Sequence, residues 1–63
     1  MNSYWHKEPK KDVTKYCLIS MLDGDILGVV VEQAGKITTR GEEYKSLKEA
    51  KKACEDAARK ATQ

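Results

Sequence analysis

CLISMLDGDILGVVVEQ, residues 17–33, holds most of the large aliphatic side chains of this 63-residue chain. It follows β-branched and aromatic residues, breaks at Asp23-Gly24 and continues into three consecutive valines. An Asp-Gly pair offers the positive φ that a tight hairpin turn requires. The stretch therefore predicts two antiparallel strands, at residues 13–22 and 26–32. Gly28, inside the second strand, predicts a bulge or a close approach by another part of the backbone.

A third strand is expected at residues 37–44, after a turn in which Gly35 takes positive φ. This segment is mostly polar and contains Gly41. Charged side chains on an outer strand discourage pairing with other chains, so residues 37–44 are predicted to form an edge of the sheet.

A helix is predicted at residues 47–61. Ser46 and Glu49 form an S-x-x-E capping box, in which hydroxyl and carboxylate satisfy backbone amides left unpaired at a helix start. Charged residues spaced four apart are expected on a solvated face. A narrow stripe on the other face is expected to be buried, and consists of Leu47, Ala50, Cys54, Ala57, Ala58 and Ala61.

These elements predict an α+β fold, in which a three-stranded antiparallel meander (13–22, 26–32, 37–44) is packed by one C-terminal helix (47–61). A chain of this length is one domain with a small core. Residues 1–12 are polar and contain Pro9, so we expect a flexible N-terminal arm before a single β-β-β-α domain at 13–63.

Both faces of the predicted sheet are apolar. Along the first strand Val13, Cys17 and Ile19 alternate with Tyr16 and Leu18. This pattern is typical of strands that are covered on both sides, whereas one helix covers one side. The second cover is the arm with Tyr4 and Trp5, a second copy of the chain, or a foreign protein. We favour a homodimer, because symmetric dimers are the commonest oligomers.

The composition argues against several classes of function. Twelve Lys and Arg balance ten Asp and Glu, so net charge does not by itself indicate nucleic acid. No apolar run is long enough to span a membrane, and the polar N-terminus lacks a signal-peptide core, which indicates a cytoplasmic protein. Cys17 and Cys54 are expected to be buried thiols.

Catalytic groups are sparse in the sequence. The single histidine, His6, has no carboxylate or thiol at ligand spacing, and no Ser-His-Asp or Cys-His set can be assembled around it. Glu42 and Glu43 are adjacent and would point to opposite faces of a strand. We therefore expect no enzymatic activity, and no metal or cofactor.

The segment 36–59, with YKSLKEAKKACE at the helix start, resembles the arm-type DNA-binding domain of phage and transposon integrases and, more loosely, the plant AP2 fold. That resemblance implies a sheet that enters the major groove of DNA. Here the sheet is rich in aliphatic residues, which supply no donors or acceptors to bases. The contacts it implies for DNA are Lys15, Lys36 and Arg40.

The pattern Gly-x-x-Tyr-x-Ser-Leu-x-Glu-Ala-Lys before an Ala-rich helix also looks like small accessory proteins of bacteriophages and prophages, which often modulate or inhibit a host protein. The sequence favours a non-enzymatic, homodimeric protein-binding module, with sheet-mediated DNA binding as the alternative. The predicted partner contacts are Tyr4, Trp5, Tyr16 and Arg40, since aromatic residues and arginine dominate interface energetics. The plainer interpretation places Tyr16 in the core, Trp5 over it and Arg40 in solvent.

Overall fold

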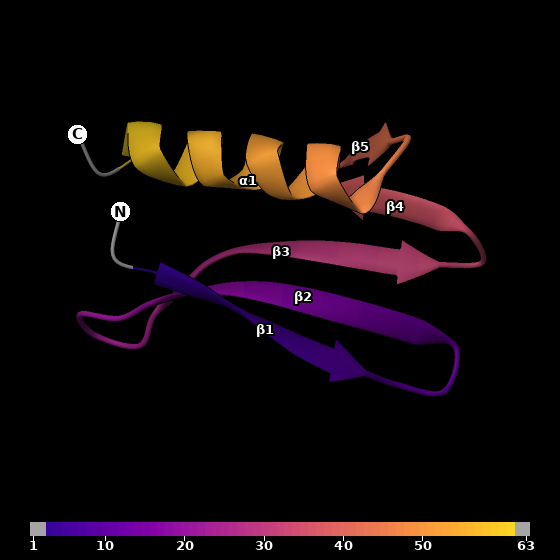
Figure 1. Cartoon of the computed structure of the whole chain (residues 1–63), viewed down its shortest axis with the longest axis horizontal. Helices are drawn as coiled ribbons and strands as arrows, with labels where there is room; N and C mark the ends of the chain where they lie inside the picture. Colours follow the sequence, from indigo (N-terminus) through magenta and orange to yellow (C-terminus); the bar gives the residue numbers. More distant parts are fainter. Residues whose placement is uncertain (1–2, 62–63) are drawn as a thin grey trace.

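A computed structural model describes residues 3–61 as one antiparallel sheet with a helix on one of its faces (Figure 1). Met1, Asn2, Thr62 and Gln63 lie outside the described residues, as does the side chain of Ala61. The strands follow one another in the sheet in the order β1-β2-β3-β4-β5. The elements are β1 (Ser3–Pro9), β2 (Val13–Ser20), β3 (Ile26–Gln33), β4 (Lys36–Thr39), β5 (Glu42–Tyr44) and α1 (Leu47–Ala61).

The α+β class, the antiparallel meander and the C-terminal helix are confirmed, but the sheet is larger than predicted. It contains five strands within residues 3–61, where the sequence predicted three. One additional strand comes from the segment expected to be an arm. The other arises because the predicted third strand is divided in two.

The first addition is β1, which lies within the segment predicted to be an irregular arm. All of its residues pair with β2, from Ser3 opposite Ser20 to Pro9 opposite Thr14. The polar composition and Pro9 led to the wrong prediction. β1 is an edge strand and Pro9 is its last residue, a position where a missing backbone amide is tolerated.

The second addition comes from residues 37–44, which form a hairpin instead of one strand. Arg40 and Gly41 have φ values of 55° and 80° and connect Thr39 directly to Glu42. Two successive residues with positive φ form the turn that matches the twist of a two-residue hairpin. Gly41 therefore reverses the chain, and the edge of the sheet is the three-residue strand β5.

The connection between β2 and β3 is longer than a tight turn. β2 ends at Ser20, whereas the sequence predicted strand up to residue 22. Gly24 has the expected positive φ, at 78°, and its amide donates to the Ser20 carbonyl at 3.0 Å. The amide of Asp25 donates to the Asp23 carboxylate at 3.1 Å. This hydrogen bond, with one from the Ser20 hydroxyl, lowers the pKa of Asp23.

The core lies between α1 and the centre of the sheet. Leu18 and Val30 are fully buried and pack against the small residues of the helix. A side chain at Gly28 would collide with the Cys54 sulfur, so glycine is needed for the helix to lie this close. The strands also bulge here, because Leu18 pairs with Gly28 whereas Ile19 pairs with Ile26. The bulge predicted from Gly28 is therefore present, whereas the close approach is made by the Cys54 side chain instead of by another part of the backbone.

The helix begins and ends where the sequence predicted. Its first turn is capped by Ser46, whose hydroxyl accepts a hydrogen bond from the Glu49 amide at 3.2 Å. Within the predicted stripe, Ala50, Cys54 and Ala58 are buried. Small side chains at these positions bring the helix axis close to β3.

Both cysteines are buried free thiols, as expected. Cys54 faces the sheet from α1, and its burial raises the pKa of the thiol, with partial opposition from the Thr39 hydroxyl as a hydrogen-bond donor to the sulfur. Cys17 pairs with His6 and Val29 on the other side of the sheet. The sheet therefore separates the two sulfur atoms, which argues against a disulfide between them.

Candidate functional site

The pairing register assigns each strand residue to one of two faces. Directly opposed residues of antiparallel strands project to the same side of the sheet. Trp5, Leu18 and Gly28 are opposed and lie on the side of α1. We call the other side the open face, and its apolar residues are Tyr4, Val13, Cys17, Ile19, Ile26, Val29 and Val31.

Apart from Cys17, which is buried, the apolar side chains of the open face are only partly shielded. Tyr4, Ile19 and Ile26 form one row across three strands, in which Tyr4 is 49% and Ile26 is 62% exposed. Met21 and Leu22, in the adjoining turn, are also exposed. Within residues 3–61 the only helix packs on the opposite face, so no element of the described chain covers this one.

Charges of both signs flank the apolar residues of the open face. Glu8 lies opposite Lys15 on β1 and β2, and Glu43 lies at the far end of the same row on β5. Lys36 stands at the start of β4, and Arg40 lies in the turn at the other end of that strand. The residues predicted to contact DNA, Lys15, Lys36 and Arg40, are therefore spread over the sheet instead of forming one basic patch.

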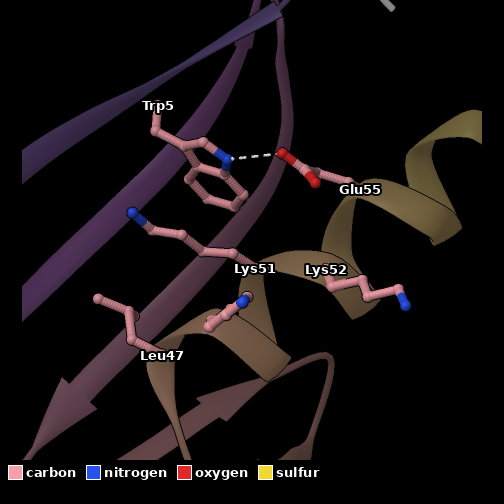
Figure 2. Close-up of a pocket in the computed structure, with 6 residues that line it drawn as sticks. Trp5, Leu47, Lys51, Lys52 and Glu55 are labelled. Atoms are coloured by element: carbon pink, nitrogen blue, oxygen red, sulfur yellow. Dashed lines mark hydrogen bonds between the residues drawn. The ribbon is translucent and has the colours of Figure 1, made fainter.

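A second feature is a groove of about 610 Å³ between β1 and the outer flank of α1 (Figure 2). It exists because the helix packs on β3, β4 and β5 and leaves the β1 side of the sheet less covered (Figure 1). We call it the β1–α1 groove. Its lining residues are Trp5, Leu47, Lys48, Lys51, Lys52 and Glu55.

Trp5 links β1 to the helix across this groove. Its indole N–H donates a hydrogen bond of 2.9 Å to Glu55, and Figure 2 shows the two side chains pointing toward each other. The Lys51 ammonium lies 5.2 Å from the centre of the Trp5 ring and 4.9 Å from that of Tyr16. Both distances are within the range of cation–π attraction.

These contacts place Lys51 and Glu55 differently from the sequence prediction. Their spacing of four residues predicted the solvated face of the helix, yet both are partly buried toward β1. The partner that turns them inward is Trp5, which is 50 positions from Glu55 in the chain. The only available signal was the unexplained presence of a tryptophan in a polar segment.

The groove carries excess positive charge. Lys48 and Lys52 are exposed, and neither forms an ion pair with any described residue. Lys7 lies on the same side of β1 as Trp5, opposite Tyr16. Among residues 3–61, the only carboxylate that lines the groove is that of Glu55, which already accepts the Trp5 N–H.

The four predicted partner contacts do not form one surface. Tyr4 projects from the open face, whereas its neighbour Trp5 lines the β1–α1 groove. Tyr16 is buried in the core beneath Lys51, and burial together with the nearby Glu32 carboxylate raises its pKa. The Tyr16 hydroxyl donates to Glu32 at 3.4 Å. Arg40 is exposed in the β4–β5 turn.

The described part of the chain, residues 3–61, contains no cluster of three His, Cys, Asp or Glu side chains able to hold a metal ion. Over the same residues, α1 is neither long enough nor apolar enough to cross a membrane. Comparison of the chain with protein-family models, curated proteins and solved structures finds no match. The resemblances to integrase arm-type domains and to small phage proteins therefore stay predictions from the sequence.

Proposed function

We propose that this chain is a non-enzymatic protein-binding module that works as a homodimer, with the open face of the sheet as the interface between the two copies. The observation that carries this proposal is the row formed by Tyr4, Ile19 and Ile26, whose apolar side chains have no cover within residues 3–61. The arm cannot be the cover, because residues 3–9 lie in the plane of the sheet as β1.

The energetic argument follows from the size of the chain. Burying a large aliphatic side chain that would otherwise be wet stabilises a protein by about 1.5–3 kcal/mol. A domain of this size has a total stability of only about 3–5 kcal/mol from its own core. Covering two or three side chains of the open face would therefore match the stability of the isolated fold. Self-association would therefore increase the stability of so small a chain substantially.

The charges of the open face favour a second copy as the cover. Glu8 and Glu43 flank the apolar residues on this face, as do Lys15 and Lys36. A two-fold axis places the same surface on both partners, so a lysine of one copy can meet a glutamate of the other. A face of mixed sign is poorly suited to the uniform negative charge of DNA.

The sequence supports a cytoplasmic setting and a task of the kind performed by small phage accessory proteins, which is to bind and modulate another protein. Packing of the two open faces would leave both helices and both β1–α1 grooves on the outside of the dimer. Those outer surfaces would then be free for the partner. Covering of the open face therefore does not compete with partner binding.

The homodimer is tested by light scattering over a dilution series, with the variant Ile26→Asp. We expect the wild-type mass to be twice that of the protomer, and Ile26→Asp to give the protomer mass with unchanged circular dichroism. Lys60→Gln makes the same change in net charge at an exposed position of α1, on the opposite side of the sheet, and should stay dimeric. A wild-type protomer mass at every concentration, or a dimeric Ile26→Asp, overturns the proposed interface.

DNA binding is tested separately by a gel shift with random duplex DNA at low and high salt. The protein-binding function predicts no complex. A complex that weakens steeply with salt would favour the DNA alternative, because phosphate contacts release counterions. In that case Lys15→Gln and Lys36→Gln should reduce the shift.

A further inference from the structure

We propose that the β1–α1 groove binds an acidic peptide segment of the partner protein. This inference rests on the proposed protein-binding function, but it does not depend on the homodimer, since the groove lies on the opposite face of the sheet. The proposal names one occupant: an extended segment in which an apolar side chain is flanked by Asp or Glu.

The walls of the groove suit an apolar side chain. The Trp5 ring stands on one side and Leu47 at one end, as Figure 2 shows. The remaining lining consists of Glu55 and the stems of three lysines, and lysine stems commonly cover apolar groups while their ammonium groups stay in water. An aliphatic side chain that enters between Trp5 and Leu47 would be enclosed mainly by carbon atoms.

The rim of the groove suits carboxylates. Lys48 and Lys52 are exposed on the helix side, and Lys7 is exposed on the same side of β1 as Trp5. None of the three pairs with a carboxylate of residues 3–61. The Lys51 charge also remains, because a ring contact does not neutralise it. Lysines around an apolar hollow attract an acidic segment and fix its register.

The walls are held in place before a ligand arrives. The Glu55 carboxylate fixes the orientation of the indole, and the Lys51 ammonium lies over both Trp5 and Tyr16. Binding to prearranged side chains loses less conformational entropy than binding to free ones. A short segment can therefore bind usefully in spite of its small contact area.

The same contacts disfavour single-stranded nucleic acid as the occupant. Base stacking requires an accessible aromatic face, and the Trp5 ring is already in contact with the Lys51 ammonium. Glu55 also places a negative charge at the Trp5 end of the groove, where a phosphate would be repelled. An acidic peptide can instead place a backbone amide or an apolar group at that end.

Trp5 makes the proposal directly measurable, because it is the only tryptophan of the chain and lines the groove. The probe is a short synthetic peptide of alternating Asp, Glu and Leu residues, titrated into the full chain while tryptophan fluorescence is recorded. We expect a saturable change that weakens as salt is added. The same peptide with Gln in place of each acidic residue should bind much more weakly.

The decisive variant is Lys48→Glu/Lys52→Glu, which reverses the rim charges and leaves Trp5, Lys51 and Glu55 unchanged. We expect a roughly tenfold loss of affinity, because two attractive charge contacts at the exposed rim become repulsive. Lys11→Glu/Lys45→Glu makes the same change in net charge at exposed positions that do not line the groove. This control should bind nearly as well as the wild type.

Three outcomes overturn the proposal: no saturable change with the acidic peptide, equal loss of affinity in both double variants, or tighter binding of an oligothymidylate that competes for the groove. Light scattering on the same samples separates this result from the homodimer. A monomer that binds the peptide overturns the proposed homodimer and supports peptide binding in the groove. A dimer that does not bind the peptide overturns the proposed role of the groove and leaves the proposed homodimer standing.

Discussion

The two faces of the sheet are built from the same strands and are both apolar, yet within residues 3–61 only one of them is covered by a helix. On the helix face, Gly28 meets Cys54 at close range, and Ala50 and Ala58 let α1 lie against β3. On the open face, the branched side chains of Ile19 and Ile26 shield one another but have no helix above them. Small residues at the contact allow the helix to cover the first face, whereas large side chains stay uncovered on the second.

Because of this difference, we expect the helix face to determine the stability of the fold and the open face to determine its association. Every fully buried large side chain belongs to the helix face, where Leu18 and Val30 are less than 2% exposed. Substitutions on the helix face should therefore unfold the chain. Substitutions on the open face should change its association and leave the folded protomer intact. The following experiments test that division, from the largest expected effect to the smallest.

The largest effect is expected for Leu18→Ala, compared with the same substitution at Leu22. Leu18 is 1% exposed, whereas Leu22 is 82% exposed in the β2–β3 connection. Removing a buried leucine side chain costs about 2–5 kcal/mol, which is comparable to the whole stability of a chain of this size. Urea unfolding followed by circular dichroism should show Leu18→Ala mostly unfolded in water. Leu22→Ala should lie within about 0.5 kcal/mol of the wild type. Equal losses would contradict the division between the faces.

The next test concerns the close approach of Gly28 and Cys54. Gly28→Ala introduces a Cβ atom that collides with the Cys54 sulfur, and overpacking of a core costs about 1–3 kcal/mol. In a Cys54→Ala background the nearest atom is the Cβ of residue 54, at 3.9 Å, which is an ordinary contact. Gly28→Ala should then cost almost nothing. A double-mutant cycle measured by chemical unfolding gives the coupling, and additive costs would show that the helix is free to move away.

The sequence contains enough local information for the helix, the positive φ at Gly24 and Gly35 and the burial of both cysteines. Each of these depends on neighbours a few residues away: the Ser46 cap, the Asp23-Gly24 pair and the small residues of one helical face. The apolar character of both sheet faces was also visible, because alternation within a strand is a local property.

The additional strands and the groove depend on interactions that are not local. β1 is polar and ends in Pro9, so only its pairing with β2 makes it a strand. The division at Arg40 requires a positive φ of 55° at a residue other than glycine, which sequence preference does not indicate. The groove depends on Trp5 meeting Glu55 and Lys51 from the opposite end of the chain. No spacing rule connects these positions.

A smaller loss of stability is expected when the N-terminal cap of α1 is removed. Ser46→Ala removes the hydroxyl that accepts the Glu49 amide, and the loss of such a cap costs about 1 kcal/mol. Lys45→Ala, at the exposed neighbouring position, is the control and should change stability by less than about 0.5 kcal/mol. Thermal unfolding followed by circular dichroism distinguishes the two. Equal melting temperatures would mean that the cap adds nothing to the packing of α1.

The smallest effect is a change in the pH dependence of stability, and it tests the packing of Tyr16 beneath the helix. Burial, together with the Glu32 carboxylate, raises the pKa of Tyr16 above its usual value of 10.0. In the unfolded chain the phenol would lose its proton at the usual value, before the folded chain does. Stability from this group is therefore complete below about pH 10 and is lost as the pH rises toward the folded pKa.

Tyr16→Phe removes that titrating group and keeps the ring that Lys51 covers. Free energies of unfolding measured at about pH 8 and about pH 11 should therefore fall less in the variant than in the wild type. Tyr44 and Cys54 also have raised pKa values, so both proteins retain a common loss of stability at high pH. The difference between the two slopes isolates Tyr16. Identical slopes would mean that water reaches the phenol, and that Lys51 and Trp5 close this edge of the helix face less tightly than their ring contacts indicate.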